Sequence, residues 1–522
     1  MPICNTSYSI QKLGMALTML CLCSSCAVKD YDDELSAFDE DAMKYINLTL
    51  TVSANNQSTR AGETPVGGEN GDGLETAFHR ENDVAGVTVI FYQNENGINA
   101  TDASAEATPI DFVGYYATTL VSREEQGKTA SYKFDEAHYT TGDQKMDAKL
   151  NSSKKYHMIV VANANLTSTI TVGNASATNG NLKAVRNLVY SSLYTGTGVG
   201  TDAKNFVMAS ENDPTITFDL STRDAINRKV TYKIDGIRVE RLSARIDFST
   251  KYYGTTNANW NPSAYARPGY VYQVWKSTDT TVPTSNDKFV VCGITPFNLS
   301  SSNEYLIKRT SINDNYAARS SEVYKYLEDE STTSWVLDVN STAAKSGSAY
   351  PSWISSASQL ENLDTQAKII ASTNPNYVEL NTTWYSSNKY TDDGTDIVIV
   401  GYSKENTIDD NTPLYYYATG IAIEGLYYAS GSLTPTPLVY YTYLRHQGEA
   451  YPSGKTAYLA RVFSDLSKTE TISSLGGKDM NYGVVRNNIY RVSINKINEK
   501  AEMELSIKVK KWDPFLHEYI YL

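Results

Sequence analysis

The chain of 522 residues is too long for one ordinary hydrophobic core, which predicts a processed N-terminus followed by two domains. Its composition, 41% hydrophobic and 20% charged, is typical of a globular protein rather than a disordered one. The net charge of −13 argues against a nucleic-acid partner, whose phosphates it would repel. The 40 tyrosines, grouped with Val, Ile and Thr, favour a mostly β fold, because these side chains suit a pleated, half-buried surface.

Residues 1–25 are predicted to be an export signal. Lys12 is followed by an apolar run, residues 13–22, that is too short to span a bilayer as a helix. The run leads into Cys23-Ser-Ser-Cys26, which resembles a bacterial lipobox. This resemblance implies that Cys26 is acylated, for example with palmitate, and becomes the first residue of the exported lipoprotein. An ordinary cleaved signal peptide is the alternative.

The cysteines offer no disulfide framework. Three of the five would leave with the signal, so that only Cys26 and Cys292 remain in the exported chain. Cys292 lies in an apolar, strand-like run at 289–293, where a thiol behaves as a small apolar side chain. We therefore expect Cys292 to be buried and structural rather than reactive.

Residues 26–60 are predicted to form a lipid-anchored propeptide with a removable strand. Its first part is acidic, which predicts a solvated tether. Apolar and polar residues then alternate without a break, which predicts a strand with one buried face. The loop that follows is polar, so a protease could reach Arg60 there. The apolar positions of the removable strand are Ile46, Leu48, Leu50 and Val52.

The next part of the chain, residues 61–250, is predicted to be the N-terminal domain. An apolar run at 156–163 predicts a central strand buried on both faces. Residues 237–248 alternate in one phase and then in another, which predicts a β-bulge near Arg241. A short helix is expected at 183–194. Further strands are expected at 84–92, ended by a turn at 94–97, and at 206–210.

Residues 251–522 are predicted to be the C-terminal domain. Alternation from Met503 to Val509 predicts a half-buried strand that ends near Trp512. The irregular stretch 310–390 predicts long surface loops, which usually carry partner contacts. Other strands are expected at 289–292, 301–309, 397–400 and 481–494, with an aromatic ladder at 415–417.

Several of these segments, in their order, resemble the fimbrillin family of Bacteroidetes, which are type V pilins. The likeness is greatest to the structural subunit of the minor (short) fimbriae. The acidic stretch after Cys26 also resembles the surface-export signal of Bacteroidetes lipoproteins, with a plain charged linker as the alternative. The segments that carry the family resemblance are 42–50 with 58–62, the "VVAN" strand, "FVM", "ERLSARIDF", and "GVVRNNIYRVSI" followed by a strand that ends in Trp512.

The resemblance implies two tandem β-sandwich (transthyretin-like) domains of antiparallel strands with few short helices. It also implies a cell outer membrane lipoprotein that an Arg-specific protease cuts between Arg60 and Ala61, with Arg80 as the second candidate. The released strand would vacate a groove that a strand of the next subunit fills. The implied partners are copies of this chain or related fimbrial subunits, and a ligand on a host or bacterial surface.

The terminal run after Pro514 is the expected donor strand. Pro514 cannot donate to a sheet ladder and would separate the run from the strand before it. The alternative is a simple edge strand of the second domain. The residues expected to enter the groove of the next subunit are Phe515, Leu516, Tyr519, Ile520, Tyr521 and Leu522.

No catalytic or cofactor signature is found in the sequence. The histidines are scattered without metal-ligand spacing, and His157 is expected to be a satisfied core residue. No G-x-S-x-G, P-loop or dinucleotide motif occurs. We therefore predict no enzyme, no metal and no cofactor. Aspartates at 392–393 and 409–410 favour turns over calcium sites, and tyrosines at 415–417, 427–428 and 440–443 favour strand packing over sugar-binding platforms.

The leading hypothesis is thus a structural subunit of a surface fimbria that supports adhesion. The alternative is a monomeric surface lipoprotein that binds a glycan or a host protein. The predicted strand before Arg60 favours the first hypothesis, because a monomer has no use for a strand that can be cut away. Shaft, tip and anchor subunits are not separated by the sequence.

Overall fold

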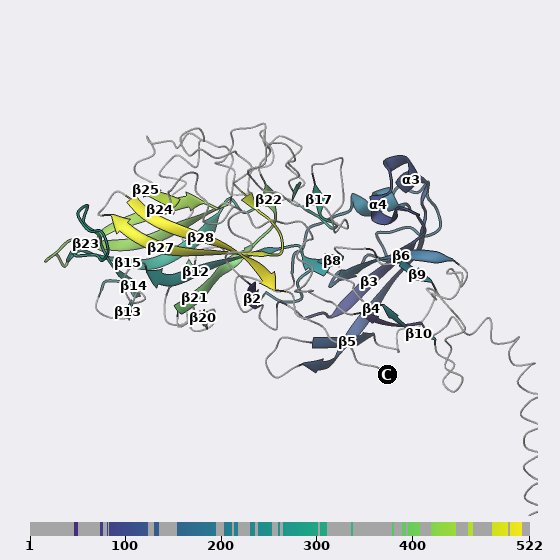
Figure 1. Ribbon diagram of the computed structural model, residues 1–522, viewed down its shortest axis with the longest axis horizontal. Helices are drawn as coiled ribbons and strands as arrows, with labels where there is room; N and C mark the ends of the chain where they lie inside the picture. The colour runs from purple at the N-terminus through teal and green to yellow at the C-terminus, as the bar shows by residue number, and fades with distance from the viewer. Residues whose placement is uncertain are drawn as a thin grey trace, which may run out of the picture.

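Figure 1 shows the computed structural model of the chain, in which strands predominate. No helix in the described part of the chain is both long and apolar enough to cross a membrane. The structure describes residues 46–50, 74–76, 81, 83–123, 130–134, 154–194, 203–210, 213, 215–217, 230–234, 239–252, 259–261, 265–300, 303–310, 336–337, 378–380, 389–392, 395–407, 419–444, 458–462, 483–498 and 502–513.

The predicted mostly β fold of antiparallel strands is confirmed. Almost every ladder between described strands is antiparallel, and the parallel ones are β1 with β10, β2 with β28 and β12 with β27. Four of the sheets have only two strands each. These pairs are β1 (Ile46–Leu50) with β10 (Val230–Ile234), β7 (Val189–Tyr190) with β16 (Glu304–Tyr305), β17 (Arg309–Thr310) with β18 (Val336–Leu337), and β22 (Asn406–Thr407) with β26 (Gly483–Val484).

A seven-stranded antiparallel sheet forms the first half of the fold. Its centre is β6 (Lys155–Ala162) beside β3 (Gly86–Tyr92), and both are largely buried because their residues are almost all apolar. The predicted central strand at 156–163 is therefore confirmed. The order is β11 (Val239–Arg241), β8 (Met208–Ser210), β6, β3, β4 (Ile110–Arg123) and β5 (Ala130–Phe134), with β9 (Thr215–Thr217) also paired to β6.

A thirteen-stranded sheet forms the second half. It includes the strands predicted at 289–292, 397–400 and 503–512. Its order is β13 (Asn259–Asn261), β14 (Gly269–Gln273), β15 (Lys288–Phe297), β23 (Gly420–Tyr428), β24 (Thr436–Tyr443), β25 (Tyr458–Val462), β28 (Glu502–Asp513), β27 (Asn488–Asn498), β12 (Ala244–Tyr252), β21 (Thr395–Ser403) and β20 (Lys389–Asp392), with β19 (Val378–Glu379) on β15 and β2 (Leu74–Thr76) on β28.

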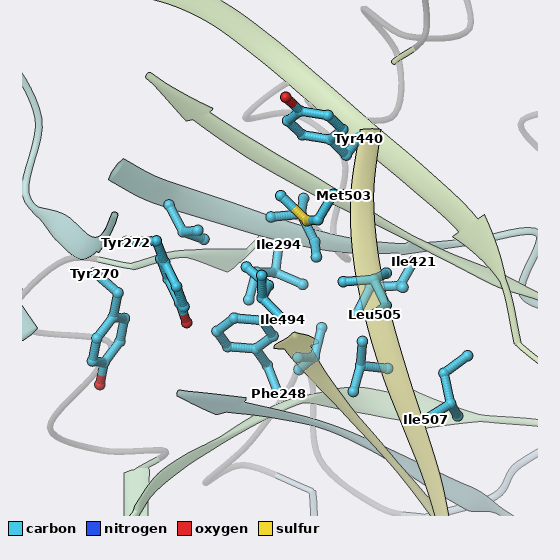
Figure 2. Packing of buried hydrophobic residues seen from close by; sticks show 14 of the residues in the cluster. Phe248, Tyr270, Tyr272, Ile294, Ile421, Tyr440, Ile494, Met503, Leu505 and Ile507 are labelled. Atoms are coloured by element: carbon cyan, nitrogen blue, oxygen red, sulfur yellow. The ribbon is translucent and has the colours of Figure 1, made fainter. Parts of the chain in front are cut away.

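The second sheet folds over its own hydrophobic core, as expected for a sandwich. Phe248 of β12 and Ile294 of β15 belong to distant strands of the sheet order, yet both lie in one buried cluster. Figure 2 shows these side chains together with Ile494, Leu505 and Ile507 from β27 and β28. The apolar positions of β28 that the sequence predicted therefore face the core, as far as its side chains are described.

The predicted β-bulge near Arg241 is wrong. The change of phase occurs because β11 ends at Arg241 in the first sheet and β12 begins at Ala244 in the second. A shift in register does occur further on, between Ile246 and Asp247. The chain thus crosses between the sheets at 242–243, while the domain bounds 61–250 and 251–522 stay a prediction.

The predicted helix at 183–194 is shorter and begins earlier. Helix α4 spans Leu182–Arg186, where the Asn181 side chain accepts a hydrogen bond from the Ala184 N–H and caps the start. It ends by Asn187, and β7 follows at once. A second helix, α3 (Asp102–Ala107), was not predicted; Thr101 caps its start in the same way. The expected turn after β3 contains a 3-10 turn at Gly97–Asn99.

Candidate assembly site

The predicted removable strand forms β1, in a two-stranded sheet of its own with β10. The ladder is parallel and runs from Ile46 opposite Val230 to Leu50 opposite Ile234. Strand β1 also lies close to β5, the edge strand of the first sheet. Leu48 occupies the middle of the ladder, opposite Tyr232. Three of the four predicted positions are thus in a paired strand, and Val52 lies outside the described residues.

The next described strand after β1 pairs with the second sheet. Strand β2 runs parallel to the end of β28, with Leu74 opposite Lys511 and Thr76 opposite Asp513. Glu81 follows β2, and the chain enters the first sheet at β3. Cys26, Arg60, Ala61, Arg80 and the expected donor residues Phe515, Leu516, Tyr519, Ile520, Tyr521 and Leu522 lie outside the described residues.

Glu81, which precedes the first sheet, is fully buried against strands of the second. Its Oε1 accepts a hydrogen bond from the Tyr402 hydroxyl at 2.6 Å, and its Oε2 lies 3.0 Å from Nη1 of Arg245. Its backbone carbonyl accepts a hydrogen bond from Nε of Arg241 at 3.1 Å. Its exposed fraction is 0%. Both the side chain and the backbone of Glu81 are therefore fixed by residues far away in the sequence.

Arg245 holds two buried carboxylates at once. Its Nε and Nη2 each donate to a carboxylate oxygen of Asp247 at 2.9 Å, while Nη1 faces Glu81. The Tyr390 hydroxyl donates to Asp247 at 2.7 Å and accepts from both Arg245 and Arg491. Burial disfavours the charge of Arg245, but the carboxylates of Asp247 and Glu81 outweigh it and raise the pKa of the guanidinium. Arg245 and Arg491 thus lie against the buried carboxylates of Glu81 and Asp247, beside the Arg241 that holds the Glu81 backbone.

Apolar packing surrounds this junction between the sheets. The Tyr402 ring meets the ring of Phe206 at a centroid distance of 4.8 Å and that of Tyr194 at 5.6 Å. Ile399 and Ile489 of the second sheet lie in the same buried cluster as Val87 and Val160 of the first. The two sheets therefore share part of their core.

A second buried ionic group lies around Arg486. Its Nη2 is 2.7 Å from Oε2 of Glu405 and donates to the Tyr305 carbonyl at 2.6 Å. Burial disfavours the charge of Arg486, and nearby Glu405 more than compensates, so its pKa is raised. Close by in sequence to Tyr305, Lys308 pairs with Glu240 of β11 at 2.6 Å. The Lys308–Glu240 pair fastens the segment after β15 to the first sheet, and Arg486 joins the same segment to the connection between β26 and β27.

His157 is a satisfied residue, as predicted. Its Nδ1 lies 3.0 Å from Oδ2 of Asp213, which also accepts from the Tyr92 hydroxyl and the Ile98 N–H. The hydrogen bond to Asp213 raises the pKa of His157 against the opposing effect of burial. The described residues contain no group of His, Cys, Asp and Glu side chains able to hold a metal ion.

The remaining sequence interpretations can be placed. Cys292 is buried in β15 and is not in a disulfide, as predicted. Tyr440, Tyr427 and Tyr428 are buried, which confirms that they pack between strands, whereas 415–417 lie outside the described residues. Asp392 lies opposite Thr395 at the end of the antiparallel ladder of β20 and β21, as expected if a turn joins the two strands, whereas 393–394 and 409–410 lie outside the described residues.

The buried network around Arg245 was missed by the sequence analysis. Its one local signal is the spacing of Arg245 and Asp247, which places two opposite charges on the polar face of one alternating strand. Glu81, Tyr390 and Tyr402 come from distant parts of the chain and give no signal of their own.

Comparison with known proteins completes the description. No family model and no curated protein matches the chain. A solved structure of a candidate cell adhesion protein from Parabacteroides distasonis matches 90% of this chain and 98% of its own, with 12% identity and a TM-score of 0.40. The fimbrilin FimA of Porphyromonas gingivalis matches 91% and 99%, with 10% identity and a TM-score of 0.35. The tip fimbrial protein Mfa3 of the same species matches 84% and 98%, with 10% identity and a TM-score of 0.33. These three solved structures are of fimbrial and cell adhesion proteins.

Proposed function

We propose that this chain is a structural subunit of a bacterial surface fimbria that polymerises by strand exchange. The observation that carries the proposal is the position of β1. It precedes every other described element, pairs only with β10 among the described strands, and lies beside the edge strand β5. The order of sequence segments that resemble fimbrillins supports the same function.

The proposed pathway begins with export. The lipid on Cys26 holds the precursor at the outer membrane, and an Arg-specific protease then cuts between Arg60 and Ala61. The cut separates β1 from the rest of the chain, because Arg60 lies between β1 and β2. The anchored strand can then leave without unfolding either large sheet.

Removal of β1 strongly favours the binding of a replacement strand. The alternation of the sequence predicts that Ile46, Leu48, Leu50 and Val52 share one face. Burial of four such side chains contributes roughly 6–12 kcal/mol gross, which is comparable to the net stability of a whole domain. Loss of the strand also frees the backbone edge of β10, and free edges recruit other strands. The precursor therefore keeps β1 until it is cut.

The proposed replacement is the terminal segment of another copy, residues 515–522. It follows directly on β28, which ends at Asp513, and Pro514 separates the two. A related fimbrial subunit could supply an equivalent strand. Adhesion to a host or bacterial surface is then a property of the assembled fibre at the cell surface.

The test is the Arg60→Ala variant, produced in the native host. We expect a lipidated precursor that accumulates uncut and yields no SDS-resistant ladder of polymers when samples are left unheated. Glu63→Ala, in the same loop, is the matched control and should be cut and polymerise normally. Fibres of normal length from Arg60→Ala would contradict the proposal. If the unmodified chain is cut but stays a lipid-free monomer that never polymerises, the alternative is favoured, a monomeric surface protein that binds a glycan or a host protein.

The anchor has a separate test. Cys26→Ala should abolish metabolic labelling with a fatty acid and keep the precursor from the outer surface. Cys23→Ala, three residues earlier, should still be labelled. Unchanged labelling of the Cys26 variant would show that an ordinary signal peptide is removed instead.

A further inference from the structure

We infer that Glu81 determines which arginine is used in proteolytic processing. Its buried bonds keep the protease from the peptide bond after Arg80, so that the chain is cut after Arg60 instead. This inference rests on the proposed function, since it names which arginine the processing protease can use. The sequence alone left Arg60 and Arg80 as competing sites, and both are followed later in the chain by a strand.

A protease binds several residues on each side of the bond that it cuts in an extended form, so the accessibility of the backbone decides where it acts. Glu81 would be the first residue after the cut at Arg80. Its carbonyl oxygen is held by Nε of Arg241, and its carboxylate by Arg245 and Tyr402. A protease that needs these backbone groups would have to extract a residue whose exposed fraction is 0%.

The residues that follow Glu81 are fixed as well. The carbonyl of Asp83 accepts a hydrogen bond from Nδ2 of Asn163, and the N–H of Ala85 donates to Oδ1 of the same side chain, both at 2.8 Å. Val84 between them is buried, and β3 begins at Gly86. The described residues on the C-terminal side of Arg80 are therefore part of the folded body.

The segment on the N-terminal side of Arg80 is short. Only residues 77–80 separate Glu81 from β2, which pairs with the end of β28. Arg60, by contrast, comes ten residues after Leu50 and fourteen before Leu74 in the sequence. The spacing of paired residues thus favours the same arginine as the burial of Glu81.

Extraction of Glu81 would break up a buried ionic network. Arg245 would keep Asp247 as its carboxylate partner and lose Glu81, and the Tyr402 hydroxyl would lose its acceptor. Removal of one partner from a buried ion pair is strongly destabilising, and cleavage of a rarely opened segment follows the population of its open form. We expect the buried bonds of Glu81 to slow cleavage after Arg80 by about a hundredfold.

The experiment uses the detergent-extracted precursor and a purified Arg-specific protease, with N-terminal sequencing of the large product over time. The unmodified precursor should give Ala61 as its new N-terminus. Arg60→Ala should yield no product that begins at residue 81. In the Arg60→Ala background, Glu81→Ala should yield that product about a hundredfold faster, and Glu81→Gln, which keeps the shape but not the charge, should be intermediate.

Two controls separate local anchoring from general instability. Glu95→Gln removes one carboxylate from an exposed turn and should leave Arg80 protected. Val492→Ala opens a small cavity in the core of the second sheet and lowers global stability without touching Glu81. If Val492→Ala exposes Arg80 as much as Glu81→Ala does, the protection is global and the inference is wrong.

The inference is also overturned if Arg60→Ala alone is cut after Arg80 as fast as the unmodified chain is cut after Arg60, or if Glu81→Ala leaves Arg80 uncut. These readouts are independent of fibre formation. A precursor that is cut as expected but never polymerises would refute the proposed function and leave the role of Glu81 intact. Fibres that form from chains beginning at residue 81 would refute the role of Glu81 and leave the proposed function intact.

Discussion

Arg245 and Asp247 form a two-pronged ion pair within a single strand, with Nε to Oδ1 and Nη2 to Oδ2 both at 2.9 Å and both residues fully buried. Two residues apart in β12, they share one face, and the register shift between Ile246 and Asp247 occurs inside the pair. The planar fork of a guanidinium fits a carboxylate in this way, whereas a lysine ammonium does not.

Replacement of this arginine should therefore be costly. Arg245→Ala leaves the buried carboxylate of Glu81 without its cationic partner, and we expect a loss of about 3–5 kcal/mol in the free energy of unfolding. Arg245→Lys should recover less than half of that loss, because it cannot satisfy two carboxylates at once. Urea denaturation followed by tryptophan fluorescence measures both. Arg267→Ala, whose partner Glu424 is only partly buried, is the control and should cost less than about 1 kcal/mol. Equal losses for the two arginines would contradict the special weight given to the buried network.

The pair of His157 with Asp213 should make stability depend on pH. The folded state raises the pKa of His157, so the charged form is favoured by folding, and this contribution is complete below the unfolded pKa of about 6.5. It is lost as pH rises through the higher folded pKa. We expect the difference in unfolding free energy between the unmodified chain and His157→Gln to shrink as the pH is raised from about 6 to 8. Denaturation at several pH values measures it. A difference that grows with pH would mean that His157 is neutral in the fold.

The parallel ladder of β1 predicts different effects at neighbouring positions. Leu48→Asp places a charge at an apolar position of the alternating pattern, and should weaken the hold of β1 on the precursor. The neighbouring Thr49→Asp adds the same charge on the polar side of the pattern and is the matched control. We expect the Leu48 variant to aggregate or polymerise without any cut, because the freed edge of β10 recruits other strands. Light scattering and unheated SDS gels measure this. Identical behaviour of the two variants would contradict a one-sided strand.

The terminal segment has its own test. A chain that lacks residues 515–522 should fold, be cut after Arg60, and accumulate as a monomer that cannot extend a fibre. Substitution of Glu518 by Gln, inside the segment, is the mild control and should still allow growth. A truncated chain that fails to fold would support the alternative in which this segment is an edge strand of the second domain. Normal fibres from the truncated chain would exclude it as the donor.

The sequence pattern within a single strand was enough to predict the burial of β6 and β28. The apolar run of β6 and the alternation of Met503, Leu505 and Ile507 in β28 each predict the burial that the structure shows. Both signals depend only on side chains within one strand and on the period of two. The parallel partner of β1, in contrast, is set by contacts with a strand almost two hundred residues away, and no pattern within Ile46–Leu50 specifies it.

The errors have physical causes of the same kind. At Arg241 a change of phase is equally compatible with a bulge and with a passage from one sheet to another, and only tertiary pairing separates the two. Helix α4 ends early because Val189 and Tyr190 pair with Tyr305 and Glu304, which overrides any local preference. The burial of Glu81 has no local signal, since its partners Arg245 and Tyr402 are far away in sequence.

The long ladder between β27 and β28 affects how strongly the subunit resists a pulling force. It extends from Asn488 opposite Lys511 to Asn498 opposite Glu502, with hydrogen bonds perpendicular to the strands. If the next subunit is held by the segment after Asp513, tension along the fibre pulls β28 along its own axis. Such a force shears the whole ladder at once instead of opening it one bond at a time. A subunit stretched between its two ends in optical tweezers should therefore resist a higher force than one pulled across β28, and equal forces in the two directions would rule this out.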